Sequence, residues 1–240
     1  MNVIKCKDYV EASKVAADIF IEAIKANPNI TLGLATGSSP IGIYKNLIGA
    51  YEAKEISFEN IKSYNLDEYV GISRENNQSY YYFMNDNLFN HVDINKDNIH
   101  VPYAYQGKEE ESAKAYTEEL KKVSVDIQLL GIGANGHIGF NEPGTSFAQE
   151  TFIVELTQKT REDNKRFFNS IDEVPTHAIT MGIADILRAK KIVLIATGSN
   201  KAEAVKKLLS KEITTDFPAS SLHNHNDVVV VIDEAAASLL

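Results

Sequence analysis

One stretch, residues 125–144 with the sequence VDIQLLGIGANGHIGFNEPG, constrains the fold more than any other part of the chain. Its first half is apolar and ends in glycine, which predicts a strand buried on both faces of a parallel sheet. Four glycines lie within nine positions behind it, so the backbone can turn sharply and approach a ligand. Into this loop the sequence sets Asn135, His137, Asn141 and Glu142. Because open parallel sheets bind ligands beyond the carboxyl ends of their strands, we expect the loop to carry a functional site.

Two other interpretations of the loop stay open at this point. The glycines at 131, 133 and 136 match the GxGxxG dinucleotide fingerprint, but that fingerprint needs a helix to begin at the last glycine. Asn141, Pro143 and Gly144 disfavour such a helix, and with it a nicotinamide cofactor. The second alternative is a structural glycine turn in which the histidine makes only local hydrogen bonds.

Composition bounds the remaining possibilities. The 240 residues contain no linker-like segment, so we expect a single domain, 1–240. The net charge of −9 argues against nucleic acid or an anionic membrane as a partner, and an anionic substrate would need local cations. Cys6 is the only cysteine, and no signal peptide or membrane-length apolar run is present, which predicts a cytoplasmic protein without disulfides. No zinc-like spacing occurs, and His223-x-His225 is a weak metal signal, so no metal is expected.

Periodicity elsewhere alternates between strand and helix. Strands are predicted at 30–35, 61–66, 125–132, and near 152–156, 178–181, 192–197 and 228–232. Helices are predicted at 8–26 and near 40–53, 76–90, 109–123, 158–168, 182–189, 199–210 and 234–240. This alternation indicates an α/β fold: a three-layer, mostly parallel, Rossmann-like sheet with helices on both faces.

One short sequence motif occurs twice, each time at the end of a predicted strand. Thr-Gly-Ser lies between an apolar predicted strand and the start of a predicted helix in both residues 34–39 (LATGSS) and residues 195–200 (IATGSN). In the first turn, Ser38 or Ser39 is expected to cap a helix whose first residue is Pro40. Such turns expose N–H groups and hydroxyls and are candidate phosphate seats, although they also cap helices in proteins that bind nothing. Lys201 beside the second turn favours anion binding.

Taken together, the loop, the TGSSP turn and the DEYVG segment at 67–71 resemble the glucosamine-6-phosphate deaminase (glucosamine-6-phosphate isomerase) family over nearly the whole chain. The segments that carry the resemblance are LGLATGSSP at 32–40, NLDEY at 65–69, GHIGFNEP at 136–143, NKRFF at 164–168 and GSNKA at 198–202. The GHIxFNEP segment is specific to that family, whereas a TGS turn alone is a weak signal.

The resemblance implies an activity and a set of roles. The family converts glucosamine 6-phosphate and water into fructose 6-phosphate and ammonia, without metal or organic cofactor. By resemblance, Asp67 is the general base that moves a proton between C2 and C1, His137 opens the sugar ring, and Glu142 orients His137. The implied phosphate site consists of Thr36, Gly37, Ser38, Ser39, Arg166 and Lys201.

The residue types fit these roles independently. A carboxylate shielded from water can take a C–H proton and return it to the next carbon, and histidine transfers protons near neutral pH. Taken in isolation, Asp67-Glu68 would more often be turn or helix-start acids than catalytic ones. Asn135 departs from family members that carry aspartate two residues before the histidine, and it cannot supply a second negative charge to stabilise an imidazolium.

Two alternatives to this function stay open, and the alignment also leads to one expectation about regulation. The alternatives to the deaminase are a 6-phosphogluconolactonase-like hydrolase, which has a similar phosphate site and histidine loop, and a catalytically silent sugar-phosphate sensor. Larger family members are hexamers activated by N-acetylglucosamine 6-phosphate through basic residues shortly after the NEP segment. The positions that we align with those cations are Phe152 and Val154, which are apolar. We therefore expect hyperbolic kinetics, a monomer, and a small amino-sugar phosphate as the only partner.

Overall fold

The computed structural model describes residues 1–158, 161–162, 165, 168 and 170–240. Among these residues the main sheet has seven strands, all parallel, in the order β1-β10-β9-β6-β2-β3-β5. They are β1 (Asn2–Cys6), β2 (Thr31–Leu34), β3 (Lys62–Asn65), β5 (Ile99–His100), β6 (Ile127–Leu130), β9 (Lys191–Ala196) and β10 (Val228–Asp233). The predicted α/β class and mostly parallel sheet are confirmed.

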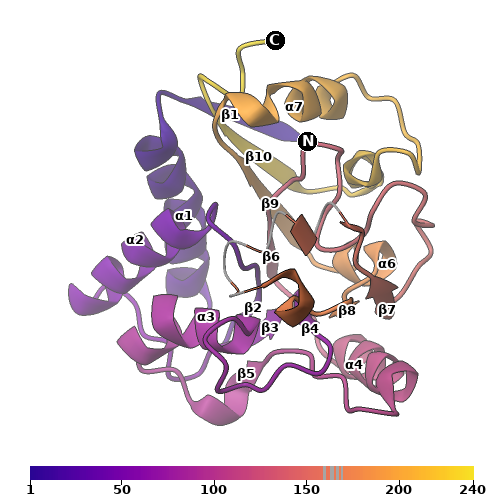
Figure 1. Cartoon of the computed structure of the whole chain (residues 1–240). Coiled ribbons are helices and arrows are strands. Elements are labelled where there is room, and N and C mark those ends of the chain that lie inside the picture. Colours follow the sequence, from indigo (N-terminus) through magenta and orange to yellow (C-terminus); the bar gives the residue numbers. More distant parts are fainter. Residues whose placement is uncertain (159–160, 163–164, 166–167, 169) are drawn as a thin grey trace.

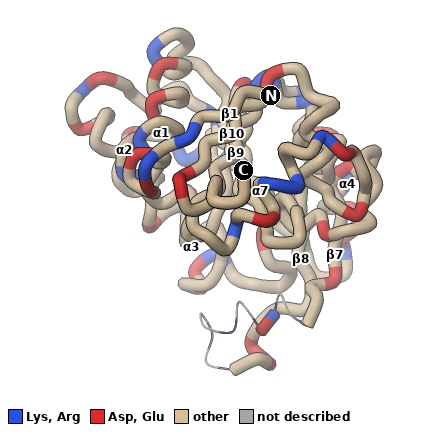
Figure 2. Tube along the Cα trace, turned by 90° about the horizontal axis from the view of Figure 1, so that it is seen from above, with Lys and Arg blue, Asp and Glu red and all other residues tan. Residues whose placement is uncertain are grey.

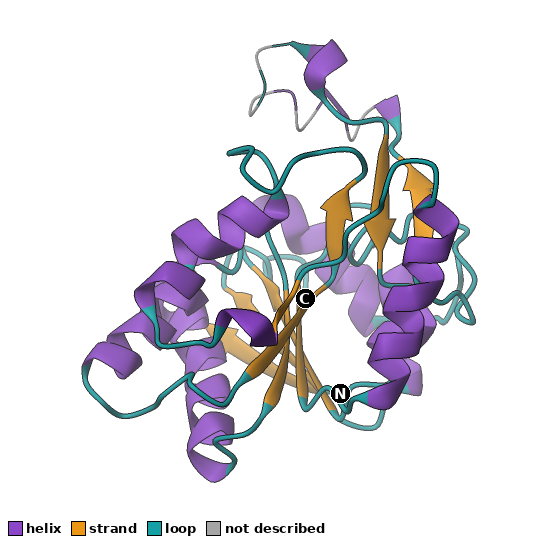
Figure 3. Ribbon diagram, turned by 90° about the horizontal axis from the view of Figure 1, so that it is seen from below, coloured by secondary structure: helices purple, strands orange, loops and turns teal. Residues whose placement is uncertain are grey.

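Helices lie on both sides of this sheet (Figure 1), and the view from below shows the strands between two groups of helices (Figure 3). They are α1 (Tyr9–Ala26), α2 (Ile41–Glu52), α3 (Tyr80–Asn87), α4 (Glu109–Lys122), α6 (Ile183–Ile186) and α7 (Ala202–Leu209). The central strands β6, β9 and β10 are buried along almost their whole length, since helices cover both of their faces.

Helix α1 illustrates how the local sequence sets an element. Asp8 caps it by accepting a hydrogen bond from Glu11 N at 3.0 Å, and the helix ends at Ala26, ahead of Asn27-Pro28. Its inward face is small and apolar, with Ala12, Ala16 and Phe20 fully buried. This face packs against α2 and β10, which brings the start of α1 close to the first Thr-Gly-Ser turn.

A second sheet differs from the prediction. The strands predicted near 152–156 and 178–181 exist as β7 (Phe152–Glu155) and β8 (His177–Thr180), but they are antiparallel and lie outside the main sheet. With β4 (Asp67–Tyr69) they form a three-stranded sheet of order β4-β8-β7. The short strands β1, β4 and β5 were not predicted, because runs of two to five residues are too short to show a periodicity.

Several helix boundaries also differ. The helix predicted at 234–240 is wrong: hydrogen bonds of mixed spacing, such as Ala237 N to Asp233 O and Leu240 N to Ala237 O, make a series of turns there. Neither Ser38 nor Ser39 caps α2, whose capping residue is Pro40. The helix predicted near 182–189 is a single turn, and the one near 199–210 begins with a 3-10 turn at Ser199–Lys201. The helix predicted near 158–168 falls partly outside the described residues.

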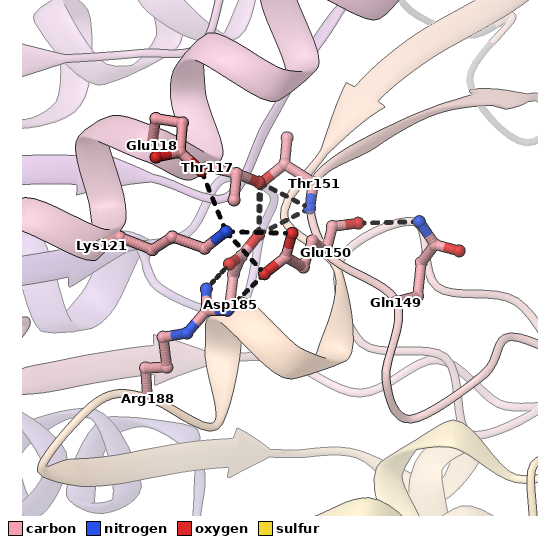
Figure 4. A network of polar contacts seen from close by, with 8 residues as sticks. All are labelled: Thr117, Glu118, Lys121, Gln149, Glu150, Thr151, Asp185 and Arg188. Atoms are coloured by element: carbon pink, nitrogen blue, oxygen red, sulfur yellow. Dashed lines mark hydrogen bonds and ion pairs between the residues drawn. The ribbon is translucent and has the colours of Figure 1, made fainter.

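A polar network fastens the small sheet to its neighbours (Figure 4). The buried carboxylate of Asp185 in α6 accepts hydrogen bonds from Thr117 Oγ1 in α4 at 3.0 Å and from Thr151 Oγ1 at 2.7 Å, and it pairs with Arg188. Glu150 pairs with Lys121 at 3.1 Å and with Arg188 at 2.6 Å. The network therefore joins α4, α6 and the segment leading into β7.

Charge and hydrophobicity are distributed as in a protein that folds around one large core. Lys and Arg lie among Asp and Glu over the outer helices (Figure 2). Among the described residues, none of the helices combines the length and the apolar character needed to span a bilayer.

Candidate active site

The sheet order brings the sequence features together. Strands β9, β6, β2 and β3 are neighbours and parallel, so their carboxyl ends lie at one edge of the sheet. Behind these four ends come the second Thr-Gly-Ser turn, the glycine loop, the first Thr-Gly-Ser turn and Asp67, respectively. Residues separated by up to 160 positions in sequence thereby face one region, which is where open α/β sheets bind ligands.

Asp67 is buried at this edge. It begins β4 and pairs with Thr180 of β8, so it is neither a turn acid nor a helix-start acid. Only 7% of it is exposed, and a Cβ added to Gly139 would lie 3.6 Å from its Oδ2, which places the glycine loop directly against the carboxyl. Burial, together with the negative charge of Glu68, raises the pKa of Asp67 to about 8. A carboxyl with such a pKa is a much stronger base than an exposed aspartate.

The glycine loop is a compact turn, not a helix start. Gly133 N donates to His137 O at 2.9 Å and Gly136 N donates to Gly133 O at 3.0 Å, so the dinucleotide interpretation fails. Gly136 has φ +86°, and a Cβ there would lie 2.2 Å from the ring of Phe217. The ring of His137 packs on the backbone of Gly133, where an added Cβ would lie 2.3 Å from Cε1. Glycine at 133 therefore leaves the space that the histidine ring occupies.

Asn135 links the two candidate acid–base residues. The Nδ1 atom of His137 lies 3.5 Å from Glu142 Oε1, and it makes no hydrogen bond with the described residues. Asn135 Nδ2 donates to Glu142 Oε2 at 2.7 Å, while its Oδ1 accepts from His137 N at 3.2 Å. The asparagine amide thus holds the carboxylate beside the imidazole. An ionised aspartate could not donate to Glu142, so the departure at Asn135 gives the loop a hydrogen bond that the acid would lack.

The loop is anchored next to Asp67. Asn141 is fully buried, and its Nδ2 donates to Ile138 O and Met181 O, each at 2.8 Å. Phe140 N donates to Oγ1 of Thr180 at 3.1 Å, and Thr180 is the strand partner of Asp67. The histidine loop and the aspartate are therefore held against the same strand. Sequence reasoning placed Asn141 in the loop without this anchoring role.

A cleft of about 870 Å³ joins the two Thr-Gly-Ser turns. Ser38 and Ser39 line it from the first turn, and Thr197, Asn200 and Lys201 line it from the second. Burial lowers the pKa of the Lys201 amine, which shows that the ammonium lies in a partly desolvated position where an anion would be held strongly. Thr36 is half-buried and Gly37, with φ +98°, is exposed in the same turn. Arg166 lies outside the described residues.

Tyr9 was missed by sequence reasoning. Its hydroxyl accepts from Gly42 N at 2.8 Å and lies 3.2 Å from Ser38 O, to which it can donate. It therefore braces the turn that carries Ser38 and Ser39 from a distance of about thirty positions in sequence. No local pattern around a lone tyrosine at the start of a helix signals this contact.

The chain is similar in sequence to known proteins over almost its whole length. Residues 9–231 match the family of glucosamine-6-phosphate isomerases/6-phosphogluconolactonase. The chain belongs to this family. A glucosamine-6-phosphate deaminase of Thermoanaerobacter sp. (strain X514) is 52% identical over 100% of this chain and 95% of its own. The glucosamine-6-phosphate deaminase of Clostridium perfringens (strain 13 / Type A) is also 52% identical, over 100% of both chains.

Two solved structures have folds similar to that of this chain. A monomeric glucosamine-6-phosphate deaminase superposes with a TM-score of 0.97 at 48% identity, over 100% of both chains. The 6-phosphogluconolactonase from Trypanosoma brucei has a TM-score of 0.77 at 17% identity, over 100% of this chain and 98% of that one, which shows a shared fold. Both deaminases and lactonases of the family thus share this architecture.

In this family member the site offers three kinds of chemistry. The buried carboxyl of Asp67 suits a base, the partly exposed pair of His137 and Glu142 suits proton transfer, and the cleft at Lys201 suits an anion. In the part of the chain that the structure describes, no group of three or more His, Cys, Asp or Glu side chains could hold a metal ion.

Proposed function

We propose that the protein is a glucosamine-6-phosphate deaminase. The observation that carries the proposal is the convergence of a buried Asp67 with the His137–Glu142 pair at one sheet edge, beside the cleft of the two Thr-Gly-Ser turns. Relatives 52% identical over the whole chain bear the same activity in their names. In this proposal the 240 residues act as one catalytic unit, and no metal is required.

The proposed roles follow the reaction. The phosphate is held by Ser38, Ser39 and Lys201, with Thr36, Gly37 and Arg166 as further members of the phosphate site, so that one end of the open-chain sugar is fixed. His137, held beside Glu142 through Asn135, passes a proton to the ring oxygen and opens the ring. The base Asp67 then takes the proton from C2 and returns it to C1 through an enediol-type intermediate, while the oxygen on C1 gains a proton and the amine nitrogen loses one. This leaves an imine at C2, to which water adds before ammonia departs.

The buried aspartate separates this function from the alternatives. A lactonase needs histidine to activate water, and a sensor needs only the phosphate cleft, so neither requires a strong base shielded from solvent at position 67. The overall reaction is an isomerisation coupled to deamination, in which hydrolysis is confined to the last step.

The test is ammonium release from glucosamine 6-phosphate by the purified chain in the presence of a metal chelator. We expect turnover in the wild type and none in Asp67→Asn. Hydrolysis of 6-phosphogluconolactone without ammonium release would assign the chain to the lactonases instead. Binding of either sugar phosphate without turnover would assign it to the sensors.

A further inference from the structure

Glu68, next to the proposed base, is a buried carboxylate with a complete set of backbone donors. It is 1% exposed. Its Oε1 accepts from Tyr69 N and Tyr80 N, and its Oε2 accepts from Tyr81 N, each at 2.9 Å. Tyr80 and Tyr81 are the first two residues of α3, whose N–H groups have no partner inside the helix. Glu68 therefore receives both hydrogen bonds and the favourable field of the helix N-terminus.

The cap of α3 is shared between two side chains. Ser79, the capping residue, accepts from Tyr82 N at 3.0 Å, so Glu68 and Ser79 together satisfy the three N–H groups of the first turn. Glu68 contributes the charge and Ser79 contributes only a neutral hydroxyl. Glu68 and Ser79 therefore allow a comparison between a charged and an uncharged side chain that cap the same helix.

Strand geometry separates Glu68 from the substrate side. Successive residues of a strand point to opposite faces, so Asp67 faces the glycine loop while Glu68 faces α3. Burial raises the pKa of Glu68, whereas the three backbone hydrogen bonds and the charge of Arg74 oppose that rise. The guanidinium of Arg74 is itself held over the ring of Tyr81, 4.7 Å from its centroid. The three backbone N–H donors and the guanidinium favour the ionised form of Glu68, which lies one residue from Asp67 on the side away from the glycine loop.

We propose that Glu68 is a positioning residue of the active site: its ionised carboxylate fastens the strand of Asp67 to α3 and, through its charge, makes Asp67 a stronger base. The proposal rests on the proposed function, in which Asp67 is the base. The titratable groups that interact electrostatically with Asp67 include Tyr44, Tyr80 and Tyr116. Burial raises the pKa of each of these tyrosines, so they stay neutral while the carboxyls titrate.

The experiment compares pH–rate profiles of the wild type, Glu68→Gln and Ser79→Ala. Wild-type ammonium release is measured first, because its absence would overturn the proposed function and not the role of Glu68. In Glu68→Gln we expect the acidic limb of kcat/KM to move by about one pH unit toward lower pH, since the neighbouring charge is gone. We expect kcat on the alkaline plateau to fall several-fold, because the base is weaker, while KM stays within about twofold.

Ser79→Ala is the control for loosening the helix without changing charge. It should lower the melting temperature and leave the acidic limb where it is in the wild type. Superimposable profiles for the wild type and Glu68→Gln would overturn the proposal, as would an equal shift in Ser79→Ala.

A measurement on the wild type keeps the proposal testable if Glu68→Gln does not fold. Carbon-13 NMR of the side-chain carboxyls should show Glu68 already ionised at the pH where Asp67 titrates. Glu68 protonated throughout that transition would remove the charge on which the proposal depends.

Discussion

At the scale of single residues, the site depends on groups whose ionisation the fold changes. Asp67 has a pKa of about 8 because it is buried and lies next to Glu68, whereas the ordinary value is 3.8. At neutral pH the unliganded enzyme therefore holds this carboxyl mostly protonated. If Asp67 is the base, as we propose, activity and stability respond to pH in opposite directions, since the base must be charged and folding favours the neutral form.

The first prediction concerns the rate. The value of kcat/KM should rise with pH through an apparent pKa near 8, because the free enzyme must lose the proton of Asp67 before it can act as base. The measurement is ammonium release at low substrate between pH 5.5 and 9.5. A rate that is flat below pH 8 would show that another group is the base.

The second prediction concerns stability. The folded state binds the Asp67 proton more tightly than the unfolded chain does. The contribution of Asp67 to the free energy of unfolding is therefore largest below about pH 4, and it declines as pH rises from about 4 to about 8. Asp67→Asn should therefore gain stability at pH 8.5, on the order of a few kcal/mol at most, and gain little at pH 4. Urea unfolding at the two pH values measures the difference. An equal effect at both would contradict the burial of a charge at this position.

The third prediction separates binding from chemistry in the cleft. Lys201→Ala should raise KM roughly ten- to hundredfold, because a charge-assisted hydrogen bond contributes on the order of 1.5–3 kcal/mol to ground-state binding. Tyr9→Phe should raise KM less, since Tyr9 only braces the turn of Ser38. His137→Gln should lower kcat instead. The exposed Lys206 of α7 is the control, and its replacement by alanine should leave KM unchanged.

At the scale of elements, the loop at 131–144 holds its side chains in defined positions. It has no regular secondary structure, yet Asn141 ties it to the residue that follows β8 and Phe217 packs against Gly136. A loop whose backbone donors and acceptors are satisfied in this way holds side chains as firmly as a helix does. Glycine is consequently required at 133 and 136 by the rings of His137 and Phe217 that pack there.

The fourth prediction tests that requirement. Gly133→Ala should lower kcat strongly, since the new Cβ would lie 2.3 Å from the ring of His137 and must displace it. Gly49→Ala in α2 is the matched control: nothing lies within 4 Å of a Cβ there, and alanine should stabilise the helix by about 0.5–1 kcal/mol. Both variants are compared by steady-state kinetics and thermal melting. Full activity in Gly133→Ala would mean that the position of His137 is not critical.

At the scale of the whole molecule, the question is whether a single chain is active without a second subunit. Phe152 and Val154, at the positions that we align with the effector-binding cations of larger family members, lie in β7 and carry no charge. The solved structure with a TM-score of 0.97 is of a monomeric deaminase. A ligand can shift a conformational equilibrium only through a difference in affinity, and apolar side chains provide none for a phosphate.

The fifth prediction follows at this scale. Rates should depend hyperbolically on glucosamine 6-phosphate, N-acetylglucosamine 6-phosphate should not change the curve, and light scattering should give the mass of one 26.6 kDa chain. The control is an inhibitor titration that shows the assay detects binding at the active site. Sigmoidal kinetics that the effector abolishes would show that its phosphate is bound by other residues.

The sequence alone predicted the parallel sheet, most of the helices that cover it and the residue types in the loop at 131–144. These features are local: a wholly apolar strand such as β9 or β10, an amphipathic helix such as α1, and a cluster of glycines each leave a pattern in neighbouring residues. The GHIxFNEP segment likewise identified the family from consecutive positions. The same local patterns could not show where β7 and β8 pair.

Only the tertiary structure decided which side chains meet. The antiparallel pairing of Asp67 with Thr180, the hydrogen bonds of Glu68 to the first turn of α3, and the contact of Tyr9 with Ser38 each join residues that are distant in sequence. Such contacts depend on how elements pack and on burial, which also raises the pKa of Asp67, and no periodicity in the chain records them. The sequence supplied the candidate reacting groups, and only the packing of the two sheets shows that one of them, Asp67, is buried.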